Sequence, residues 1–326
     1  MKEEKLYPLK FSPILKTKIW GGEKLHSVLG KERIGNQIGE SWEISGVDGD
    51  FSVVENGFLK GENLKDLILK YKEKLVGRSI YARFKEKFPL LVKFIDAKEK
   101  LSVQVHPDDE LASKRHGTLG KTEMWYIVQA DPEAKIITGF QNGISKEDYL
   151  SHLKNESLEE ILNKESVKSG DAFFIKAGLI HAIGAGVLLA EIQETSDITY
   201  RIYDYNREGI DGKQRELHTQ LALDTIDYSN NDDYKIRYSL EENKLNSLVD
   251  CSYFSTQLLH LKEDYNFKLP INNDCFVILM CVEGSTLIEY EEGKEEISVG
   301  ESILIPANLR EITISSKNCK LLHVTI

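Results

Sequence analysis

The chain has 326 residues, 41% of them hydrophobic, and 42 Lys and Arg against 53 Asp and Glu give it a net charge of −11. This length and composition are typical of a globular protein with one large or two ordinary domains and a substantial core. The acidic balance argues against a nucleic-acid or anionic-membrane surface, which needs clustered Lys and Arg, although a few local basic groups can still hold one phosphate.

The N-terminus and the cysteines indicate the compartment. The first residues, MKEEKLYPLKFSP, lack the apolar region of a signal peptide, and the longest apolar run, residues 276–282, is too short to span a bilayer. The four cysteines have neither CxxC spacing nor the density of a disulfide scaffold, so we expect buried, reduced thiols. These features predict a cytoplasmic protein with no membrane partner.

Short apolar or alternating runs dominate the chain. In order they are SWEISG, PLLVKFIDA, KLSVQVH, EMWYIVQA, AKIITGF, GDAFFIKAG, GVLLAEIQE and ITYRIYDY, then a second series from YFSTQLLHL to KLLHVTI. So many strands at this spacing predict an antiparallel sandwich or barrel. Helical spacing is found at residues 63–75 behind Asn63, at 107–116 before Gly117, after Ser145, and at 157–164, where Ser157 and Glu160 form a capping-box pattern.

The segment 227–244 is polar and rich in Asn and Asp, which predicts a junction between two units, residues 1–238 and residues 239–326. Residues 169–183 and 299–313 share the pattern Gly-acid-x-x-x-Ile-x-Ala, as two related β-sandwich units would. The second copy has Arg310 and Glu311 where the first has His181. We therefore expect the second unit to bind no metal, to pack on the first and to shield its site.

Four polar residues on separate strands or strand ends are candidate metal ligands: Gln104, His106, Glu123 and His181. Gln104 and His106 alternate in a run that Pro107 ends at once, so their side chains face one space. Histidine and carboxylate are ordinary ligands of zinc and other divalent first-row metals. Ligands so distant in sequence have no diagnostic spacing, however, and a single histidine of this kind is more often a satisfied or exposed residue.

Motifs around these residues change that balance. GDAFFIKAGLIHAI resembles the second cupin motif, and QVHPDDELA followed by GKTEMWYI resembles the first, with Gln-x-His in place of His-x-His. The segment AEIQETSDITYRIYDYNR, residues 190–207, resembles the Ser-Asp-x-x-x-Arg segment of the same family. Together the motifs resemble the type I mannose-6-phosphate isomerases (phosphomannose isomerases) in their short bacterial form, from about KIWGG to residue 220. The resemblance implies a mainly β fold of two cupin-like jelly-roll units with a few short helices.

The resemblance also implies a reaction and a metal site. One Zn²⁺ per chain would be bound by the four candidate ligands, and the enzyme would interconvert mannose 6-phosphate and fructose 6-phosphate through an enediol. Gln104 would then be a neutral oxygen ligand, so the set would bring only the negative charge of Glu123. A site that stays net positive suits an anionic sugar phosphate.

Further residues take roles by the same resemblance. Arg201 matches the family's essential arginine and would orient the substrate and stabilise an oxyanion. For the proton transfer, Lys121, Asp197 and a metal-bound water remain open alternatives. Residues expected to bind substrate, chiefly its phosphate, are Ser102, Lys93 and Arg207, and residues matching family positions near the pocket are Trp20, Glu40 and Trp42.

Two other interpretations stay open. A metal-binding cupin that only binds or senses a sugar would keep the four ligands but would need neither Lys121 nor Arg201. A different cupin enzyme, such as an iron dioxygenase or another sugar-phosphate isomerase, could use the two histidines and one glutamate. We expect a small-molecule partner, no nucleic acid or membrane, and a monomer or homodimer.

Overall fold

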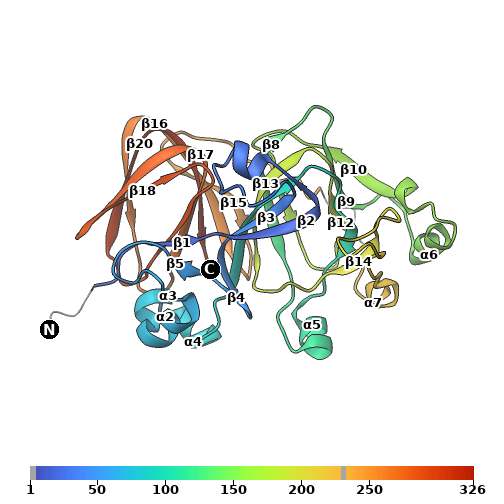
Figure 1. Ribbon diagram of the computed structural model, residues 1–326, viewed down its shortest axis with the longest axis horizontal. Helices are drawn as coiled ribbons and strands as arrows, with labels where there is room; N and C mark the ends of the chain where they lie inside the picture. Colours follow the sequence, from blue (N-terminus) through green and yellow to red (C-terminus); the bar gives the residue numbers. More distant parts are fainter. Residues whose placement is uncertain (1–4, 229–232) are drawn as a thin grey trace.

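The computed structural model describes residues 5–228 and 233–326, so the predicted junction 227–244 lies partly outside the described residues. Within these ranges the strands form three antiparallel sheets, accompanied by seven short α-helices (Figure 1). The expectation of a mainly β fold with a few short helices is therefore confirmed.

Two of the sheets face each other across a buried core. The first has the order β11-β8-β13-β6-β3-β2 with β4 on β3, and the second has the order β10-β9-β12-β7-β14. The strands of the first are β2 Ile14–Gly22, β3 Ile38–Val47, β4 Asp50–Phe51, β6 Leu90–Ala97, β8 Glu123–Ala130, β11 Ala172–Ile175 and β13 Val187–Glu194. Those of the second are β7 Val103–Val105, β9 Lys135–Phe140, β10 Leu162–Ser166, β12 His181–Ile183 and β14 Tyr200–Tyr203. Trp125 and Phe173 of one sheet share a buried cluster with Ile136 and Ile183 of the other.

Helices cover the outer face of the second sheet. Tyr149 of α6 Lys146–Lys154, Leu158 of a 3-10 turn Leu158–Glu160 and Ala222 of α7 Thr219–Leu223 pack in one cluster with Val105 and Ile202. The predicted helix after Pro107 is α5 Asp109–His116, which Asp108 caps by accepting a hydrogen bond from the Leu111 N–H and which Gly117 ends in a left-handed conformation. Capping by Ser145 at the start of α6 is likewise confirmed.

The helices near the N-terminus are α1 Lys24–Ser27, α2 Leu64–Tyr71, α3 Glu73–Val76 and α4 Arg78–Phe84. Asn63 caps α2 as predicted, but the expected continuous helix breaks at Lys72, whose φ is 51°. The prediction of a helix starting at Ser157 is wrong. Only the 3-10 turn forms there, without a side-chain cap, because residues from Leu162 onward pair with β9.

The third sheet builds the C-terminal unit. Its order is β15-β16-β20-β17-β19-β1-β5 with β18 on β17. Its strands are β1 Leu9–Ser12, β5 Val53–Val54, β15 Leu245–Asp250, β16 Ser255–Pro270, β17 Val277–Tyr290, β18 Gly293–Ser298, β19 Ser302–Ile305 and β20 Glu311–Thr325. This unit has its own buried core, which includes Leu279 and Leu321. Strand β1 pairs with β19, so residues near the start of the chain complete the sheet of the C-terminal unit.

The internal similarity corresponds to equivalent local structure. Gly170 and Gly300 both have a φ of 88°, and each is followed after one residue by a short strand, β11 or β19. His181 then opens β12, and Glu311 opens β20. The two units also pack together as expected, because one buried cluster contains residues of both: Ile44, Val92 and Met124 with Phe276 and Leu322.

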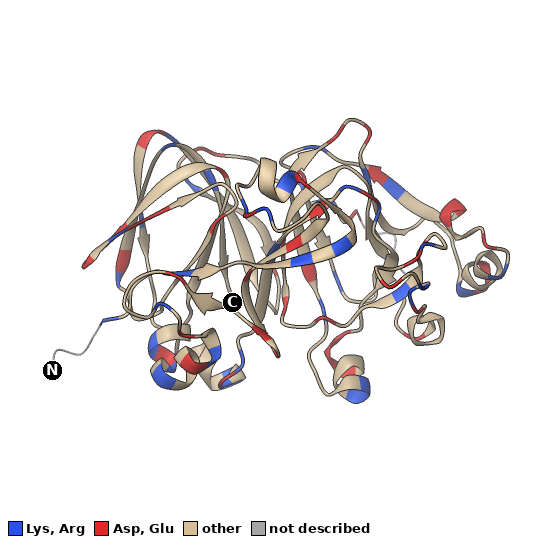
Figure 2. Cartoon of the chain, in the orientation of Figure 1, with Lys and Arg blue, Asp and Glu red and all other residues tan. Residues whose placement is uncertain are grey.

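Charge and hydropathy agree with the composition. Figure 2 shows Lys and Arg interspersed with Asp and Glu along the strands and helices. In the described part of the chain, no helix is long and apolar enough to span a membrane. The four cysteines are free, and three of them are buried.

Candidate metal centre and active site

Strand register brings three of the predicted site residues to one face of the second sheet. His181 of β12 lies directly opposite Gln104 of β7, and Gln104 lies opposite Arg201 of β14. Residues directly opposite each other in antiparallel strands project from the same face. An imidazole, a carboxamide and a guanidinium therefore project from one face of this sheet, opposite the face that packs against α6 and α7.

The four predicted ligands meet at that face. The Nε2 atoms of His106 and His181 are 3.1 Å apart, and the Gln104 amide lies 3.3 Å from the His181 Nε2. The Glu123 carboxylate, at the start of β8, lies 3.4 Å from the His106 Nε2 and 3.8 Å from the His181 Nε2. The ligand atoms of the two histidines and Glu123 all lie within 4.8 Å of one another, close enough to surround one ion.

Backbone hydrogen bonds fix the tautomer of both imidazoles. Nδ1 of His106 donates to the carbonyl oxygen of Ile198 and Nδ1 of His181 donates to that of Leu179, each at 2.9 Å. A carbonyl can only accept, so the proton of each neutral ring is on Nδ1 and Nε2 carries a lone pair. Two such lone pairs facing each other at 3.1 Å are matched by a cation between them.

Burial adds to this preference for a cation. It lowers the pKa of His181 to about 4 and that of His106 well below its ordinary value, so both rings are neutral ligands. Burial and the nearby Glu191 raise the pKa of Glu123 to about 7, and its Oε2 is buried without a hydrogen-bond partner. A divalent cation would satisfy that oxygen and stabilise the carboxylate. The residues present therefore fit a metal ion.

Two short connections hold the ligands in place. Gly178, with a φ of 85°, donates its N–H to the carbonyl oxygen of His106 at 2.9 Å, which ties the turn before His181 to the end of β7. The carbonyl oxygen of Pro107 accepts a hydrogen bond from the Lys121 N–H at 3.1 Å. This brings the Lys121 Nζ within 3.3 Å of Glu123, as its expected place beside the metal requires.

A second buried group of charges lies on the opposite sheet. Lys93 of β6 pairs with Glu191 of β13 at 2.6 Å, and Glu191 also accepts a hydrogen bond from the Trp125 indole at 2.7 Å. Burial lowers the pKa of Lys93, but Glu191 and Glu40 outweigh it and raise the pKa above its ordinary value. The sequence did not point to Glu191, because its charge partner is almost 100 residues away and its own run, GVLLAEIQE, resembles any buried strand.

Arg201 belongs to a cluster of arginines around Asp204. The Arg207 Nη2 donates to the Asp204 carboxylate at 2.7 Å, and the Arg215 Nε donates to it at 2.6 Å. Three guanidinium groups and one carboxylate leave a local charge of about +2, and the buried Nε atoms of Arg201 and Arg207 have no hydrogen-bond partner. Unused donors with excess positive charge are the features that an anion-binding site needs.

A tight turn builds this cluster. Tyr205 and Asn206 have φ values of 58° and 55°, and the Arg207 N–H donates to the Asp204 carbonyl oxygen at 3.1 Å. Left-handed non-glycine residues are rare, and a pair of them holds Arg207 beside Asp204. Sequence patterns did not identify Arg215, because it lies within a polar segment rich in charge, residues 206–216, in which no motif singles it out.

The remaining predicted residues lie at different depths. Ser102 is buried two residues before Gln104, just ahead of β7. Asp197 is exposed and lines a separate cavity of about 390 Å³ with Phe51 and Thr118. Over residues 5–228 and 233–326, no hydrogen bond or ion pair joins Asp197 to the four ligands.

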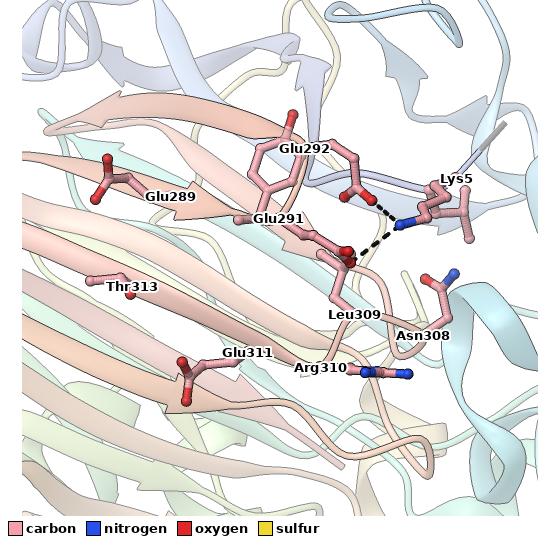
Figure 3. Close-up of a pocket in the computed structure, with 11 residues that line it drawn as sticks. Lys5, Glu289, Glu291, Glu292, Asn308, Leu309, Arg310, Glu311 and Thr313 are labelled. Atoms are coloured by element: carbon pink, nitrogen blue, oxygen red, sulfur yellow. Dashed lines mark hydrogen bonds and ion pairs between the residues drawn. The ribbon is translucent and has the colours of Figure 1, made fainter.

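A larger cavity, of about 640 Å³, lies on the C-terminal unit, far in sequence from the predicted site. Lys5 forms ion pairs there with Glu291 and Glu292, and Glu289 and Glu311 add two more carboxylates (Figure 3). None of the predicted site residues is among the residues that line it. Its acidic lining repels an anionic substrate, so the candidate active site remains between the two sheets of the larger unit.

Comparisons with known proteins identify the family to which this chain is similar. Residues 8–143 match the family model of the type I phosphomannose isomerase catalytic domain, and residues 244–326 match that of the mannose-6-phosphate isomerase cupin domain. The chain is 35% identical to mannose-6-phosphate isomerase ManA of Bacillus subtilis, over 94% of this chain and 95% of that protein. It is 40% identical to the mannose-6-phosphate isomerase of Streptococcus mutans, over 67% of each chain.

A solved structure extends the likeness to the whole fold. The crystal structure of the mannose 6-phosphate isomerase from Bacillus subtilis superposes with a TM-score of 0.89 at 33% identity, covering 98% of this chain and 100% of that one. Full-length similarity at this identity confirms the resemblance in the motifs. The chain belongs to the type I phosphomannose isomerase family and is an enzyme, an aldose–ketose isomerase.

Proposed function

We propose that the enzyme interconverts mannose 6-phosphate and fructose 6-phosphate through an enediol, with one Zn²⁺ held by Gln104, His106, Glu123 and His181. The observation that carries the metal is the pair of buried imidazole Nε2 atoms 3.1 Å apart, each ring tied through Nδ1 to a backbone carbonyl. The names of the relatives support the sugar phosphate.

The chemistry requires a proton to leave C2 of the open-chain aldose and to arrive at C1 of the ketose. When bound, the metal would polarise the sugar oxygens as a Lewis acid and so acidify the neighbouring C–H. Arg201 projects from the same face as Gln104, where its guanidinium would stabilise the developing oxyanion and orient the sugar.

Lys121 is the proposed proton shuttle. Its Nζ lies 3.3 Å from Glu123 and is buried, so it can reach a sugar bound beside the ligands. Asp197 is the weaker candidate because it is exposed and lines a different cavity. A metal-bound water remains the alternative shuttle.

The phosphate would bind at the arginine cluster. Arg201, Arg207 and Arg215 with Asp204 carry a net charge of about +2, which matches a phosphate monoester of charge about −1.5 to −2. Ser102, two residues before Gln104, would add a hydroxyl donor. We assign Lys93 to the buried pair with Glu191 at 2.6 Å rather than to the phosphate.

We further propose that residues 1–238 carry catalysis and residues 239–326 form a metal-free unit that covers the first. The enzyme would work in the cytoplasm as a monomer or homodimer, and light scattering on the purified protein distinguishes these two states. Sheet edges left open by the fold allow either one.

A coupled assay that follows fructose 6-phosphate formation tests the reaction. We expect turnover of mannose 6-phosphate, with solvent deuterium appearing at the carbon that receives the proton, and little turnover of unphosphorylated mannose. A folded, zinc-loaded protein without turnover would favour a sugar-binding cupin, and oxygen uptake would favour a different cupin enzyme.

A further inference from the structure

Arg201 is hydrogen-bonded to residues 216–218, a segment for which the sequence predicted no role. The N–H of His218 donates to the Arg201 carbonyl oxygen at 2.7 Å, and the Arg201 N–H donates to the His218 Nδ1 at 3.1 Å. The Arg201 Nη1 donates to the Glu216 carbonyl oxygen at 3.0 Å. Both backbone groups and the guanidinium of one arginine are thus held by two residues, Glu216 and His218.

The position of Arg201 in the sheet explains why these hydrogen bonds matter. Strand β14 is the last strand of the second sheet and pairs on one side with β7. The backbone groups of Arg201 that bond to His218 are on the other, open side of the strand. An edge strand is free to shift unless something else holds it, and a shift of about 1 Å at a reacting group can cost about a hundredfold in rate.

His218 is itself held in place by helix α7. It precedes α7, and its carbonyl oxygen accepts the Ala222 N–H at 3.0 Å. Helix α7 is tied to α5 by Arg115, whose guanidinium donates to the Leu221 carbonyl oxygen at 3.1 Å and to Asp224 at 2.8 Å. The position of the His218 Nδ1 acceptor is therefore fixed by α7 and, through Arg115, by α5. Helix α5 begins three residues after His106, one of the proposed metal ligands.

We propose that His218 is a positioning residue for Arg201. Its Nδ1 and its N–H fix the backbone of Arg201 at the open sheet edge, while the Glu216 carbonyl aims the guanidinium at the face that carries Gln104. This inference rests on the proposed function, because it takes its importance from Arg201. It requires an acceptor at the Nδ1 position, since a backbone N–H is the donor.

Three variants test that requirement. In His218→Asn the amide oxygen takes the place of Nδ1, in His218→Gln it takes the place of Nε2, and in His218→Leu the acceptor is lost. We expect His218→Asn to keep kcat/KM within about twofold of the wild type and the other two to lose about tenfold or more. His152→Leu is the matched control, because it removes a partly buried histidine whose Nδ1 bonds to Ser157 at 2.8 Å rather than to Arg201.

A merely structural role would behave differently. Equal activity of the Asn and Gln variants would overturn the proposal, and so would losses that follow the melting temperature of each variant. In an Arg201→Ala background, His218→Gln should cost nothing more, because the two changes then remove one function. Additive losses in that background would contradict a role through Arg201.

Inorganic phosphate separates this inference from the proposed reaction. If the wild type binds phosphate at the arginine cluster, phosphate raises its melting temperature, and we expect that shift to persist in His218→Asn and to shrink in His218→Gln. This result would support the positioning role even if mannose 6-phosphate were not turned over. An equal shift in both variants would contradict it.

Discussion

At the scale of single residues, backbone hydrogen bonds orient the imidazoles of His106 and His181, the two histidines that we propose as metal ligands. Each ring gives its Nδ1 proton to a carbonyl oxygen at 2.9 Å, so each Nε2 faces its partner with a free lone pair. The carbonyls belong to Ile198 and Leu179, which lie in connections rather than in strands. Connections between strands therefore orient the two rings, while strand register places Gln104 opposite His181.

The buried pair of Lys93 and Glu191 should be sensitive to the loss of either partner. Lys93→Met leaves Glu191 buried without its cation, and we expect the free energy of unfolding to fall by about 3–5 kcal/mol in urea titrations. Lys93→Met combined with Glu191→Gln should recover part of that loss, because the unpaired charge is gone. A double variant less stable than Lys93→Met would show that packing, not charge, dominates.

The lowered pKa of His323 should make the stability of the fold depend on pH. Its side chain is buried in β20 opposite Leu279, and burial lowers its pKa to about 4, against about 6.5 when unfolded. Between these values the unfolded chain binds the extra proton, so stability falls as pH drops from about 6.5 to about 4, by up to about 3 kcal/mol. His323→Leu should flatten this part of the curve, measured by urea unfolding at several pH values. An unchanged slope between those pH values would contradict it.

At the scale of elements, local signals predicted what local contacts decide. Asp108 and Gly117 bracket α5, and Ser145 caps α6, as their sequences indicate. The break of the predicted helix 63–75 has a distant cause. The carbonyl oxygens of Leu75 and Val76 accept hydrogen bonds from the Ala307 and Phe276 N–H groups, so the C-terminal unit imposes the turn at Lys72.

That turn makes a testable prediction. Lys72 has φ 51° and ψ −128°, a region that glycine alone adopts without strain. Lys72→Gly should therefore raise the free energy of unfolding by about 1 kcal/mol. Lys70→Gly, inside α2, is the control and should lower it by about 1 kcal/mol. If thermal unfolding shows both variants equally destabilised, the turn at Lys72 carries no strain.

Contacts between distant residues explain what the sequence left out of the site. Gln104 and His106 could be paired from alternation alone, and the motifs implied Glu123, His181 and Arg201. Register then placed Arg201 opposite Gln104. Glu191, Arg215 and His218 escaped prediction because each owes its role to one partner, Lys93, Asp204 or Arg201, that no local pattern connects to it.

At the scale of the whole molecule, the two units share structure that their sequence boundary hides. Strand β1 completes the sheet of the C-terminal unit through its pairing of Leu9 with Leu304. Apolar residues of both units, among them Val92, Met124 and Phe276, form one buried cluster. No local pattern predicts a pairing between strands so far apart in the chain, so the division at residue 238 describes the sequence better than the sheets.

Shortening the chain tests that dependence. Ending it at residue 238 would expose the apolar face that contains Val92 and Met124 and would leave β1 without β19. We expect the shortened protein to aggregate or to unfold without cooperativity. Light scattering would detect the aggregation, and circular dichroism during heating would show the loss of cooperativity. A shortened chain that stayed soluble and fully active would show that the C-terminal unit neither covers the active site nor is needed to complete the fold of residues 1–238.

The dependence of isomerisation on a metal held by Gln104, His106, Glu123 and His181 is tested most directly by metal removal. Turnover of mannose 6-phosphate and metal content would be measured together on purified, chelator-treated and zinc-restored enzyme. We predict that activity and zinc disappear together, that both return when zinc is added, and that Glu123→Gln is not restored in this way. Full turnover by the chelated, metal-free protein would contradict the proposed site.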